Sequence, residues 1–161
     1  MATNSTRWRC PADSSRLRQL AGVTSLVLAA CCSSPSEVPV EAKPLIAGEH
    51  SAIEVAGTEV LRSREEWLAW WSRHQAGGVA QNQPPEVDWS RDVAVAVTLG
   101  TRPTLGYGVE LESARREGDV VHVLFRERTP DPGMLQGQVV THPFLVVVLP
   151  RAEIRAELSD D

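Results

Sequence analysis

Apolar and polar residues alternate along several short runs in the second half of the chain. From Asp92 to Leu99, valines and a leucine share one face of a strand, and Ala94 and Ala96 place small side chains on the other. Residues 107–112 and 120–126 alternate in the same way, and a short polar turn that contains a glycine joins them. Two alternating runs joined by such a turn predict a β-hairpin.

Further strands are expected on both sides of this hairpin. Residues 139–149 form the most apolar run and predict a buried strand, with Pro143 near its start, where a missing amide costs the fewest hydrogen bonds. Apolar residues between positions 53 and 60 alternate with polar neighbours and predict one or two short strands. We expect residues 154–161 to trail from the fold as an acidic end.

One segment has the periodicity of a helix. Its aromatic residues repeat at i, i+3, i+4 and i+7 as Trp67, Trp70, Trp71 and His74, and Leu68 widens the same face. Ser63 and Glu66 fit a capping box at its start, and a glycine pair ends it. Such a stripe suits either sugar stacking or burial against a sheet, and we predict burial. We expect His74 to cap helix carbonyls rather than to bind a metal.

These elements together predict a mainly β domain of the α+β class. We expect an antiparallel β sandwich or rolled sheet with the tryptophan-rich helix packed on it. No alternation of strand, helix and strand follows residue 92, which excludes a parallel doubly wound sheet.

The first thirty residues resemble a targeting segment rather than part of a fold. Four arginines precede an apolar run over residues 20–30, which is too short to span a bilayer, since a span needs about 20 residues. The run ends in a leucine and two alanines before Cys31 and so resembles the bacterial lipobox, in which the cysteine is acylated and becomes the first mature residue. The alternative is an ordinary signal peptide cleaved after Ala30, with Cys31 merely nearby.

We therefore divide the chain into three parts. Residues 1–30 are expected to be a lipoprotein signal peptide, and residues 31–50 a lipidated Cys31 followed by a flexible tether rich in proline and serine. Residues 51–161 are expected to form the β domain. Cys10 would leave with the signal and Cys31 would carry the lipid, so the remaining Cys32 has no partner for an internal disulfide.

The charge of the mature chain argues against polyanionic partners. Cleavage before Cys31 would remove four of 16 basic and one of 21 acidic residues, which leaves 12 and 20 and a formal charge of -8. Binding to nucleic acid depends on clustered lysine and arginine, so we expect no nucleic-acid partner. The lipid on Cys31 would be the whole membrane anchor.

The chain shows no arrangement of residues typical of catalysis or metal binding. Its four histidines fall outside the spacings of metal sites, and there is no GxSxG elbow and no glycine-rich phosphate loop before a helix. Glu110 and Glu112 share a strand face, where Arg126 and Arg128 across the hairpin explain them better than acid–base chemistry does. We expect a protein that is not an enzyme and that holds no cofactor.

The loop between the strand that ends at Leu99 and the hairpin contains a proline and several glycines, so its backbone conformation is more narrowly defined by the sequence than that of the other predicted loops. It contains Arg102, Pro103, Thr104, Leu105, Gly106 and Tyr107, and we expect it to lie beside Pro132 and Gly133 of a second loop and beside His142 and Pro143. Proline restricts the backbone, and loops on a rigid sheet are common binding surfaces. We predict a partner-binding surface here, with Arg102 and Thr104 reaching the partner. The alternative is that proline and glycine merely turn the chain.

A series of blocks between Glu65 and Pro150 resembles a known family. In order they are EEWxxWW, VDWSxDVxVxVxLG, GTRPTxGY, TPDPG and THPFxVVVLP. They are similar to the C-terminal domain of the PrcB family, bacterial lipoproteins named for a subunit that stabilises a cell-surface protease complex. The resemblance implies a non-enzymatic accessory role and favours a location in the envelope that faces outward, at the outer membrane or the cell surface.

Residues 102–107 also resemble the NPTTGY loop of chagasin-like inhibitors of cysteine proteases, which are Ig-like sandwiches. Arg102 stands in place of the asparagine of that loop and Leu105 in place of its second threonine, and His142-Pro143-Phe144 is a weak counterpart of the third inhibitor loop. The sequence thus predicts a lipid-anchored module that binds or stabilises a partner protein, a protease complex being one candidate. A protease inhibitor and a module that binds envelope polymer are the alternatives.

Overall fold

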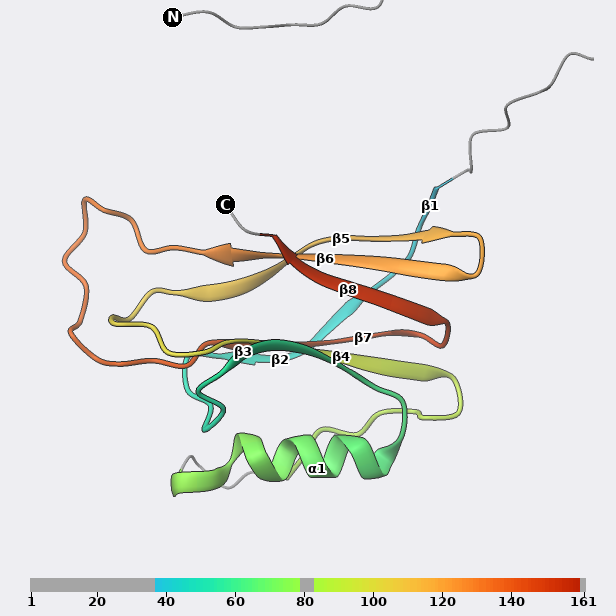
Figure 1. Ribbon diagram of the computed structural model, residues 1–161, viewed down its shortest axis with the longest axis horizontal. Coiled ribbons are helices and arrows are strands. Elements are labelled where there is room, and N and C mark those ends of the chain that lie inside the picture. Colours follow the sequence, from blue (N-terminus) through green and yellow to red (C-terminus); the bar gives the residue numbers. More distant parts are fainter. Residues whose placement is uncertain (1–36, 79–82, 160–161) are drawn as a thin grey trace, which may run out of the picture. The chain divides into compact units, whose positions relative to one another are not determined.

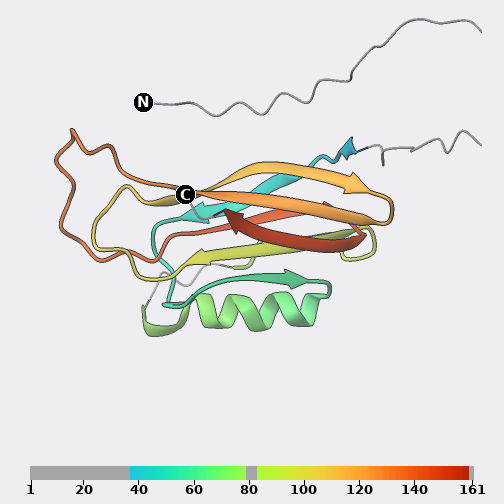
Figure 2. The ribbon, with the colours of Figure 1, turned by 45° about the horizontal axis from the view of Figure 1, so that its top comes forward.

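A computed structural model describes residues 37–78 and 83–159 (Figure 1). Within them, two sheets lie face to face and one helix lies along the outer face of one sheet, which makes three layers (Figures 1 and 2). The elements are β1 (Val38–Pro39), β2 (Lys43–Gly48), β3 (Ala56–Leu61), α1 (Arg64–His74), a 3-10 turn (Ala76–Gly78), β4 (Asp92–Leu99), β5 (Gly108–Glu117), β6 (Val120–Arg128), β7 (Phe144–Pro150) and β8 (Glu153–Ser159).

Each sheet has four strands. We name sheet A the sheet with strand order β1-β5-β6-β8, and sheet B the sheet with strand order β2-β7-β4-β3. All neighbouring strands are antiparallel except β6 and β8, which are parallel. The parallel pair arises because the chain leaves sheet B after β7 and returns in sheet A as β8 beside β6. The predicted mainly antiparallel sandwich with a packed helix is confirmed, and a rolled sheet is not formed.

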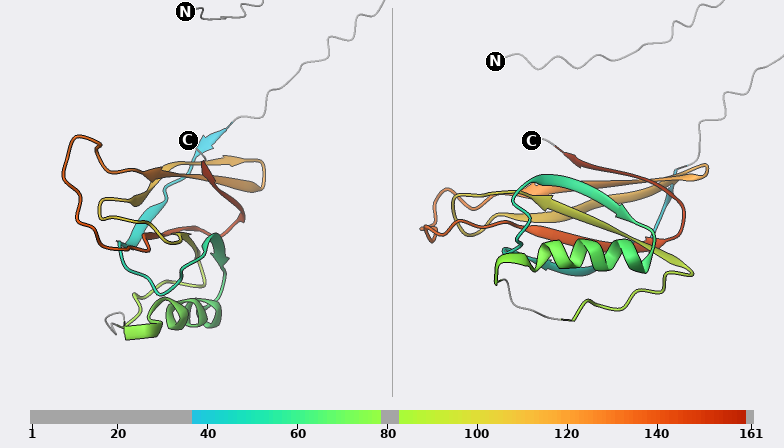
Figure 3. Two further views of the ribbon diagram at one scale, coloured as in Figure 1. Left: turned by 60° about the vertical axis from the view of Figure 1, so that its left-hand side comes forward. Right: turned by 60° about the horizontal axis from the view of Figure 1, so that its bottom comes forward.

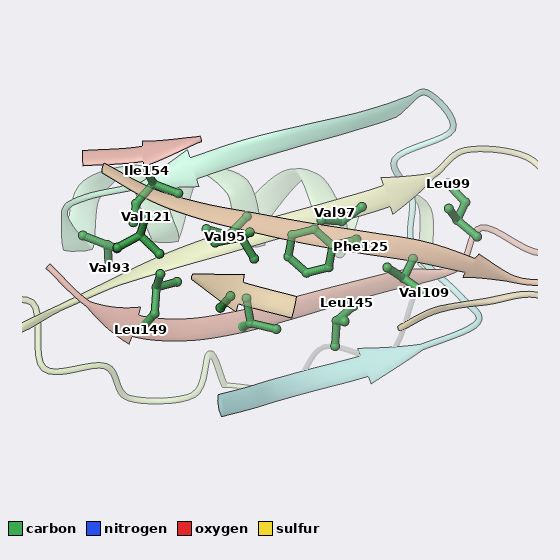
Figure 4. Packing of buried hydrophobic residues seen from close by; sticks show 13 residues of the cluster. Val93, Val95, Val97, Leu99, Val109, Val121, Phe125, Leu145, Leu149 and Ile154 are labelled. Carbon is green, nitrogen blue, oxygen red and sulfur yellow. The ribbon is translucent and has the colours of Figure 1, made fainter. Parts of the chain in front are cut away.

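The main core lies between the two sheets (Figure 4). The alternating valines of β4 and Leu99 point into it and are fully buried, as the sequence pattern predicted. Phe125 from β6 packs against them from sheet A with 0% exposure, and Ile154 closes the same cluster from β8. Each fully buried side chain of this size contributes about 1.5–3 kcal/mol of transfer free energy.

Helix α1 builds a second core on the outer face of sheet B (Figure 3). Trp67, Trp70 and Trp71 are 2%, 0% and 5% exposed, so the predicted burial of the stripe is confirmed. The tryptophans lie over Ala94 and Ala96, whose small side chains leave room for the large rings. Leu68, expected to widen this face, is instead 43% exposed, because each residue is turned by about 100° from its neighbour around the helix axis.

The start of α1 follows the capping box in part. The Ser63 hydroxyl accepts a hydrogen bond from the Glu66 amide at 3.3 Å. The Glu66 carboxylate accepts the amide of Arg62 at 2.6 Å, one residue before the amide that the motif predicts. At the other end, the His74 ring does not cap the helix as expected, because its Nδ1 lies 2.9 Å from the Ser51 hydroxyl.

The structure corrects the expected tether over residues 31–50. β1 and β2 lie within it, and β2 pairs with β7 from Lys43 to Gly48. Leu45 and Ile46 pack against the tryptophan cluster, so this segment belongs to the domain, which begins before Ser51. Pro44 is tolerated because β2 is an edge strand.

Two other boundaries differ from the prediction. Residues 153–159 form β8 rather than a trailing acidic end, because Ile154 reaches the core and the strand pairs with β6. β7 begins at Phe144 rather than at residue 139, since Thr141 pairs with Arg102 outside the sheet and Pro143 lacks an amide. Cys31 lies outside the described residues. None of the helices in the described part of the chain is long and apolar enough to cross a membrane.

Candidate functional site

Three loops meet at one end of the sandwich, which we call the loop end. They are the β2–β3 loop (residues 49–55), the β4–β5 loop (100–107) and the β6–β7 loop (129–143). Strand register places them together, because Phe144 pairs with both Gly48 and Thr98, and Gly108 pairs with Arg128. The β6–β7 loop extends furthest in this direction, at the left of Figure 1.

Hydrogen bonds join the β4–β5 and β6–β7 loops. Arg102 and Thr141 exchange two backbone bonds, at 2.8 and 2.9 Å. The amide of Leu105 donates to the carbonyl of Gly137 at 3.1 Å, and the buried Thr141 hydroxyl donates to the carbonyl of Thr104 at 3.1 Å. The structure therefore brings together the two segments that were expected to lie side by side.

The β2–β3 loop completes the end, although no sequence pattern indicated it. The Glu49 carboxylate accepts the amide of Gly106 at 3.3 Å, and the Glu49 carbonyl accepts the amide of His142 at 2.8 Å. One residue thus connects to both of the other loops. A single glutamate near the end of the predicted tether has no local pattern that would show such a role.

Two glycines are required by this arrangement. Gly100 has φ of 72°, and a Cβ there would lie 2.8 Å from the amide nitrogen of Ala56. Gly106 has φ of 97°, and its Cβ would lie 2.9 Å from Pro130. Side chains rarely adopt such φ values, and neither site has space for one. The β4–β5 loop is therefore held both by its own backbone and by its neighbours.

Arg102 is engaged inside the protein rather than offered to a partner. Its Nε and Nη2 donate to the two carboxylate oxygens of Glu127 at 2.7 and 2.6 Å, and its Nη1 donates to the carbonyl of Leu99 at 2.8 Å. The Arg102 and Glu127 side chains are only 25% and 23% exposed. The hydrogen bonds to Glu127 raise the pKa of Arg102 above its ordinary value. The guanidinium also lies 5.9 Å from the centre of the Tyr107 ring. These contacts argue against the predicted contact of Arg102 with a partner.

The other predicted site residues differ in how far they reach solvent. Pro103, Pro132 and Gly133 are exposed, and Thr104, Leu105, Gly106, Tyr107 and His142 are partly buried. Pro143 is buried and its carbonyl accepts the amide of Leu99 at 2.9 Å. Because Pro143 continues directly into the sheet, it has no surface to present to a partner, and we remove it from the predicted site.

Sequence reasoning missed the exposed apolar residues of the β6–β7 loop. We call them the apolar tip: Met134, Leu135, Val139 and Val140. Met134 is 67% exposed, Val139 is 48% exposed and Leu135 is fully exposed. The two valines are predicted as strand residues by their apolar neighbours, and only the late start of β7 at Phe144 leaves them in a loop. Clustered exposed apolar side chains commonly mark interaction sites.

The chemical groups of the loop end bear on whether it could hold a metal ion. Within residues 37–78 and 83–159, no three histidine, cysteine, aspartate or glutamate side chains gather in a way that could hold a metal ion. Of the two histidines at this end, His142 is partly buried and its amide donates to the Glu49 carbonyl, and His50 is exposed. What the loops present to solvent is a stiff, mostly apolar projection.

Comparison with known proteins bears on the part of the chain that carries two of these loops. No curated protein and no solved structure matches the chain. Residues 93–150, which run from β4 to β7 and include the β4–β5 and β6–β7 loops, match the family model described as PrcB C-terminal. This match confirms the resemblance to the PrcB family that the sequence blocks indicated.

Proposed function

We propose that this protein is a lipid-anchored envelope module that holds a partner protein at the loop end and has no catalytic role. The observation that carries the proposal is the apolar tip, four exposed apolar side chains on a loop that the rest of the fold holds in place. The family match is compatible with an accessory subunit of a protease complex, so a protease is the partner class that we favour.

The binding role rests on the contrast between the stiff base of the loop end and its apolar surface. Residues 102, 105 and 141 fix the two long loops by backbone hydrogen bonds, and Met134 and Leu135 lie beyond this base without burial. A preorganised apolar surface loses little conformational entropy on association, which favours affinity. A protein partner is the ligand class that covers such a surface most effectively.

The direction of the domain fits an anchor at Cys31. β1, the first described strand, pairs with Arg115 and Arg116 at the far end of β5, away from the three loops. From Cys31 to Val38 the chain has seven peptide steps, which reach about 25 Å at most when extended. The nine residues of β6 separate the two ends by about 30 Å. In the proposed arrangement, the anchor is attached to the chain at the end of the domain opposite to the three loops.

The inhibitor alternative has less support than the holding role. Phe144 and Pro143, the counterparts of the third inhibitor loop, are buried, and Phe144 is 5% exposed beneath the tryptophan cluster. Arg102 replaces a loop asparagine and is tied to Glu127. A titration of the purified protein against a papain-like enzyme separates the two roles, and inhibition at micromolar concentration would favour the inhibitor.

The partner-binding role is tested by affinity capture from detergent-solubilised envelope, followed by mass spectrometry. The full chain is compared with the double variant Met134→Ser and Leu135→Ser. We expect the variant to lose at least about tenfold of the captured partner while its free energy of unfolding changes by less than about 0.5 kcal/mol, as exposed changes usually do. The matched control is Leu68→Ser, an exposed apolar residue on α1. Equal capture by both variants would end the proposal for the loop end.

The anchor is tested separately. Cells that express the chain are labelled with an alkyne-bearing fatty acid, and the membrane fraction is compared for the unchanged chain and for Cys31→Ser. We expect the label and the membrane association to disappear together in the variant. Retention of the label with serine at position 31 would show that another residue is acylated. An unlabelled but exported wild-type chain would favour an ordinary signal peptide.

A further inference from the structure

The outer face of sheet A lies on the side of the domain opposite α1 (Figure 1). β5, β6 and β8 bury Ala114, Val121, Val123 and Ile154 in the main core, so the residues that alternate with these point outward. Toward the end of the domain where β1 pairs with β5, most of these outward side chains are charged or titratable.

Strand register places three basic side chains of this face in one row. Arg115 of β5 pairs with His122 of β6, and His122 pairs with Arg155 of β8. The register of β5 with β6 is regular from Ser113 to Glu117, beyond the shift that follows Leu111. Neighbouring strands lie about 4.8 Å apart, so the two arginines flank the imidazole at about 5 Å on either side. We call Arg115, His122 and Arg155 the basic row.

Acidic side chains surround the basic row. Glu37, the first described residue, lies 2.9 Å from Arg115, and Glu117 Oε2 lies 3.8 Å from His122 Nε2. Both pairs are about half exposed, and exposed ion pairs are weak, so a ligand can replace them. Together with Glu157, these side chains line a groove of about 290 Å³.

Two opposite charges of the groove stand without a partner. Arg155 and Glu157 are exposed, and neither takes part in an ion pair among the described residues. They lie two residues apart on one face of β8, a separation of about 6–7 Å. A guanidinium matches the geometry of a phosphate, and a carboxylate accepts hydrogen bonds from an ammonium group. The ligand chemistry that satisfies both is a phosphate with an ammonium group a short linker away.

Two observations favour a membrane lipid as the source of this chemistry. Glu37 lines the groove and stands six residues after Cys31, so an extended chain holds the groove within about 22 Å of a lipid on that cysteine. The chain carries a formal net charge of -5 at pH 7, which opposes adhesion to anionic lipid. A headgroup that carries both charges meets no such repulsion.

We propose that this groove binds the phosphoethanolamine headgroup of a membrane phospholipid. The phosphate accepts hydrogen bonds from Arg155 and Arg115 above His122, and the ammonium donates to Glu157. The contact is a second attachment to the membrane, beside the acyl chains on Cys31. The choice of a lipid as the source rests on the proposed anchor at Cys31, whereas the phosphate and ammonium chemistry rests on the groove alone.

Soluble headgroups test the chemistry. The purified full chain in maltoside micelles is titrated with phosphoethanolamine, phosphocholine or inorganic phosphate, and the arginine Nε and histidine imidazole signals are followed by NMR. We expect saturable shifts at the basic row, with phosphoethanolamine binding about fivefold more tightly than the other two, on the order of one exposed ion pair. Phosphocholine has no N–H to donate to Glu157, and inorganic phosphate has no ammonium group. Equal affinities, or shifts outside the groove, would overturn the proposal.

Variants separate the two halves of the groove. Arg155→Gln should weaken binding of phosphoethanolamine about fivefold. Glu157→Gln should remove the preference for phosphoethanolamine over phosphocholine without weakening the binding of inorganic phosphate. The matched control is Arg128→Gln, an exposed arginine at the other end of β6, and it should bind as the unchanged chain does. Equal weakening by Arg155→Gln and Arg128→Gln would show a general effect of net charge and would overturn the site.

Nanodiscs identify the source of the headgroup. The lipid-anchored chain is placed in nanodiscs of phosphatidylcholine alone or mixed with phosphatidylethanolamine or phosphatidylglycerol. We expect the signals of the basic row to shift only with phosphatidylethanolamine. Equal shifts with phosphatidylglycerol would overturn a site for a headgroup with both charges. Binding of soluble phosphoethanolamine without a shift in any nanodisc would assign the groove to a free phosphorylated amine and overturn the lipid as its ligand.

Failure of the anchor and failure of the groove are separate results. The Cys31→Ser chain lacks the proposed acylation site, and it should bind soluble phosphoethanolamine as the unchanged chain does. Loss of this binding in Cys31→Ser would overturn a site built from the basic row and Glu157. The Met134→Ser, Leu135→Ser variant should also bind the headgroup normally, because the groove lies at the other end of β6 from the apolar tip.

Discussion

Helix α1 and the β6–β7 loop both contain several large apolar residues, but the tryptophans of α1 are buried and the apolar residues of the loop are exposed. In α1, Trp70 has 0% of its surface exposed, and Trp67 and Trp71 are nearly as buried. In the loop, Leu135 is fully exposed and Met134 is 67% exposed. Both segments lie on the outside of the sandwich, α1 along a face and the loop at an end (Figures 1 and 3).

The difference follows from the backbone of each segment. A helix satisfies its own amides and carbonyls, so it can place a stripe of side chains against a sheet without leaving polar groups unpaired. Around Met134, the β6–β7 loop is held by local turns: the Gly133 amide donates to the Asp131 carboxylate at 2.8 Å, and the Met134 amide donates to the Asp131 carbonyl at 3.1 Å. Burying such a loop would leave backbone amides and carbonyls without hydrogen-bond partners, which costs free energy, so its apolar side chains stay in water.

The contrast shows that apolar side chains of this fold divide into those that are buried and stabilise it and those that stay exposed, to which the proposed function assigns binding. The tryptophans stabilise the domain because they leave water on folding. The apolar tip contributes little to folding and retains its transfer free energy for association. Substitutions in α1 should therefore change the free energy of unfolding, and substitutions in the apolar tip should change binding.

The largest expected effect is that of Trp70→Ala. Removing a fully buried tryptophan leaves a cavity among Trp67, Trp71 and Phe144, and large-to-small changes of this kind cost about 3–5 kcal/mol. Urea unfolding followed by far-UV circular dichroism measures the loss. Trp70→Phe should lose less, because most of the volume stays filled. A loss below about 1 kcal/mol for Trp70→Ala would mean that the helix does not anchor the sheet face.

Arg102→Ala should have the next largest effect and tests whether the loop end has a structural base. It leaves the Glu127 carboxylate, only 23% exposed, without its two donors, which we expect to cost about 2 kcal/mol of unfolding free energy. Arg128→Ala is the matched control, an arginine on the same end with no acidic partner among the described residues, and it should change stability by less than about 0.5 kcal/mol. Similar losses for both would contradict the structural role of Arg102.

Acid should lower the free energy of unfolding through His74, the last residue of helix α1. Burial lowers the pKa of His74 from 6.5, and the groups that face its ring are neutral: Ser51, Trp70, Trp71 and Phe144. The unfolded chain therefore binds a proton near pH 6.5 that the folded chain does not. Stability is full above this pH and falls below it, by at most about 1.4 kcal/mol per pH unit.

The measurement is the urea midpoint between pH 7.5 and pH 5.5 for the unchanged chain and for His74→Gln. We expect the midpoint of the unchanged chain to fall through this window and that of the variant to change less. Parallel curves would assign the pH dependence to other groups.

The smallest expected effect on folding is that of Leu135→Ser. Because this side chain is fully exposed, the free energy of unfolding should change by less than about 0.5 kcal/mol. Differential scanning calorimetry checks this against Leu68→Ser on the exposed side of α1. A clear loss of stability would show that the apolar tip packs against the fold in solution, and the comparison with α1 would then fail.

Several features of the molecule follow from local sequence patterns. The valines of β4 alternate with alanines, and this alternation alone separates the face that lies in the core from the face that lies under the helix. The spacing of the tryptophans predicted α1 and its buried face, and the hairpin of β5 and β6 was predicted from its two alternating runs. In each case the period of the backbone is fixed, so the side-chain pattern determines the face.

Other features depended on contacts between distant residues. Residues 43–48 lie in a segment with three prolines and little apolar periodicity, which indicates a tether, and only pairing with β7 makes them a strand. Arg102 has the sequence context of a recognition residue, yet Glu127, twenty-five positions away, decides that it is held internally. No sequence pattern indicated that Glu49 joins the other two loops of the loop end.

The sequence by itself thus determined which residues are periodic, where the helix begins and which family the central segment resembles. The tertiary structure decided which charged side chains of sheet A share a row, which loops share an end and which exposed apolar residues remain uncovered. The physical reason is that periodicity and capping act between residues a few positions apart. Edges, loop ends and ion pairs are set by strand order, which depends on the summed packing of the whole domain.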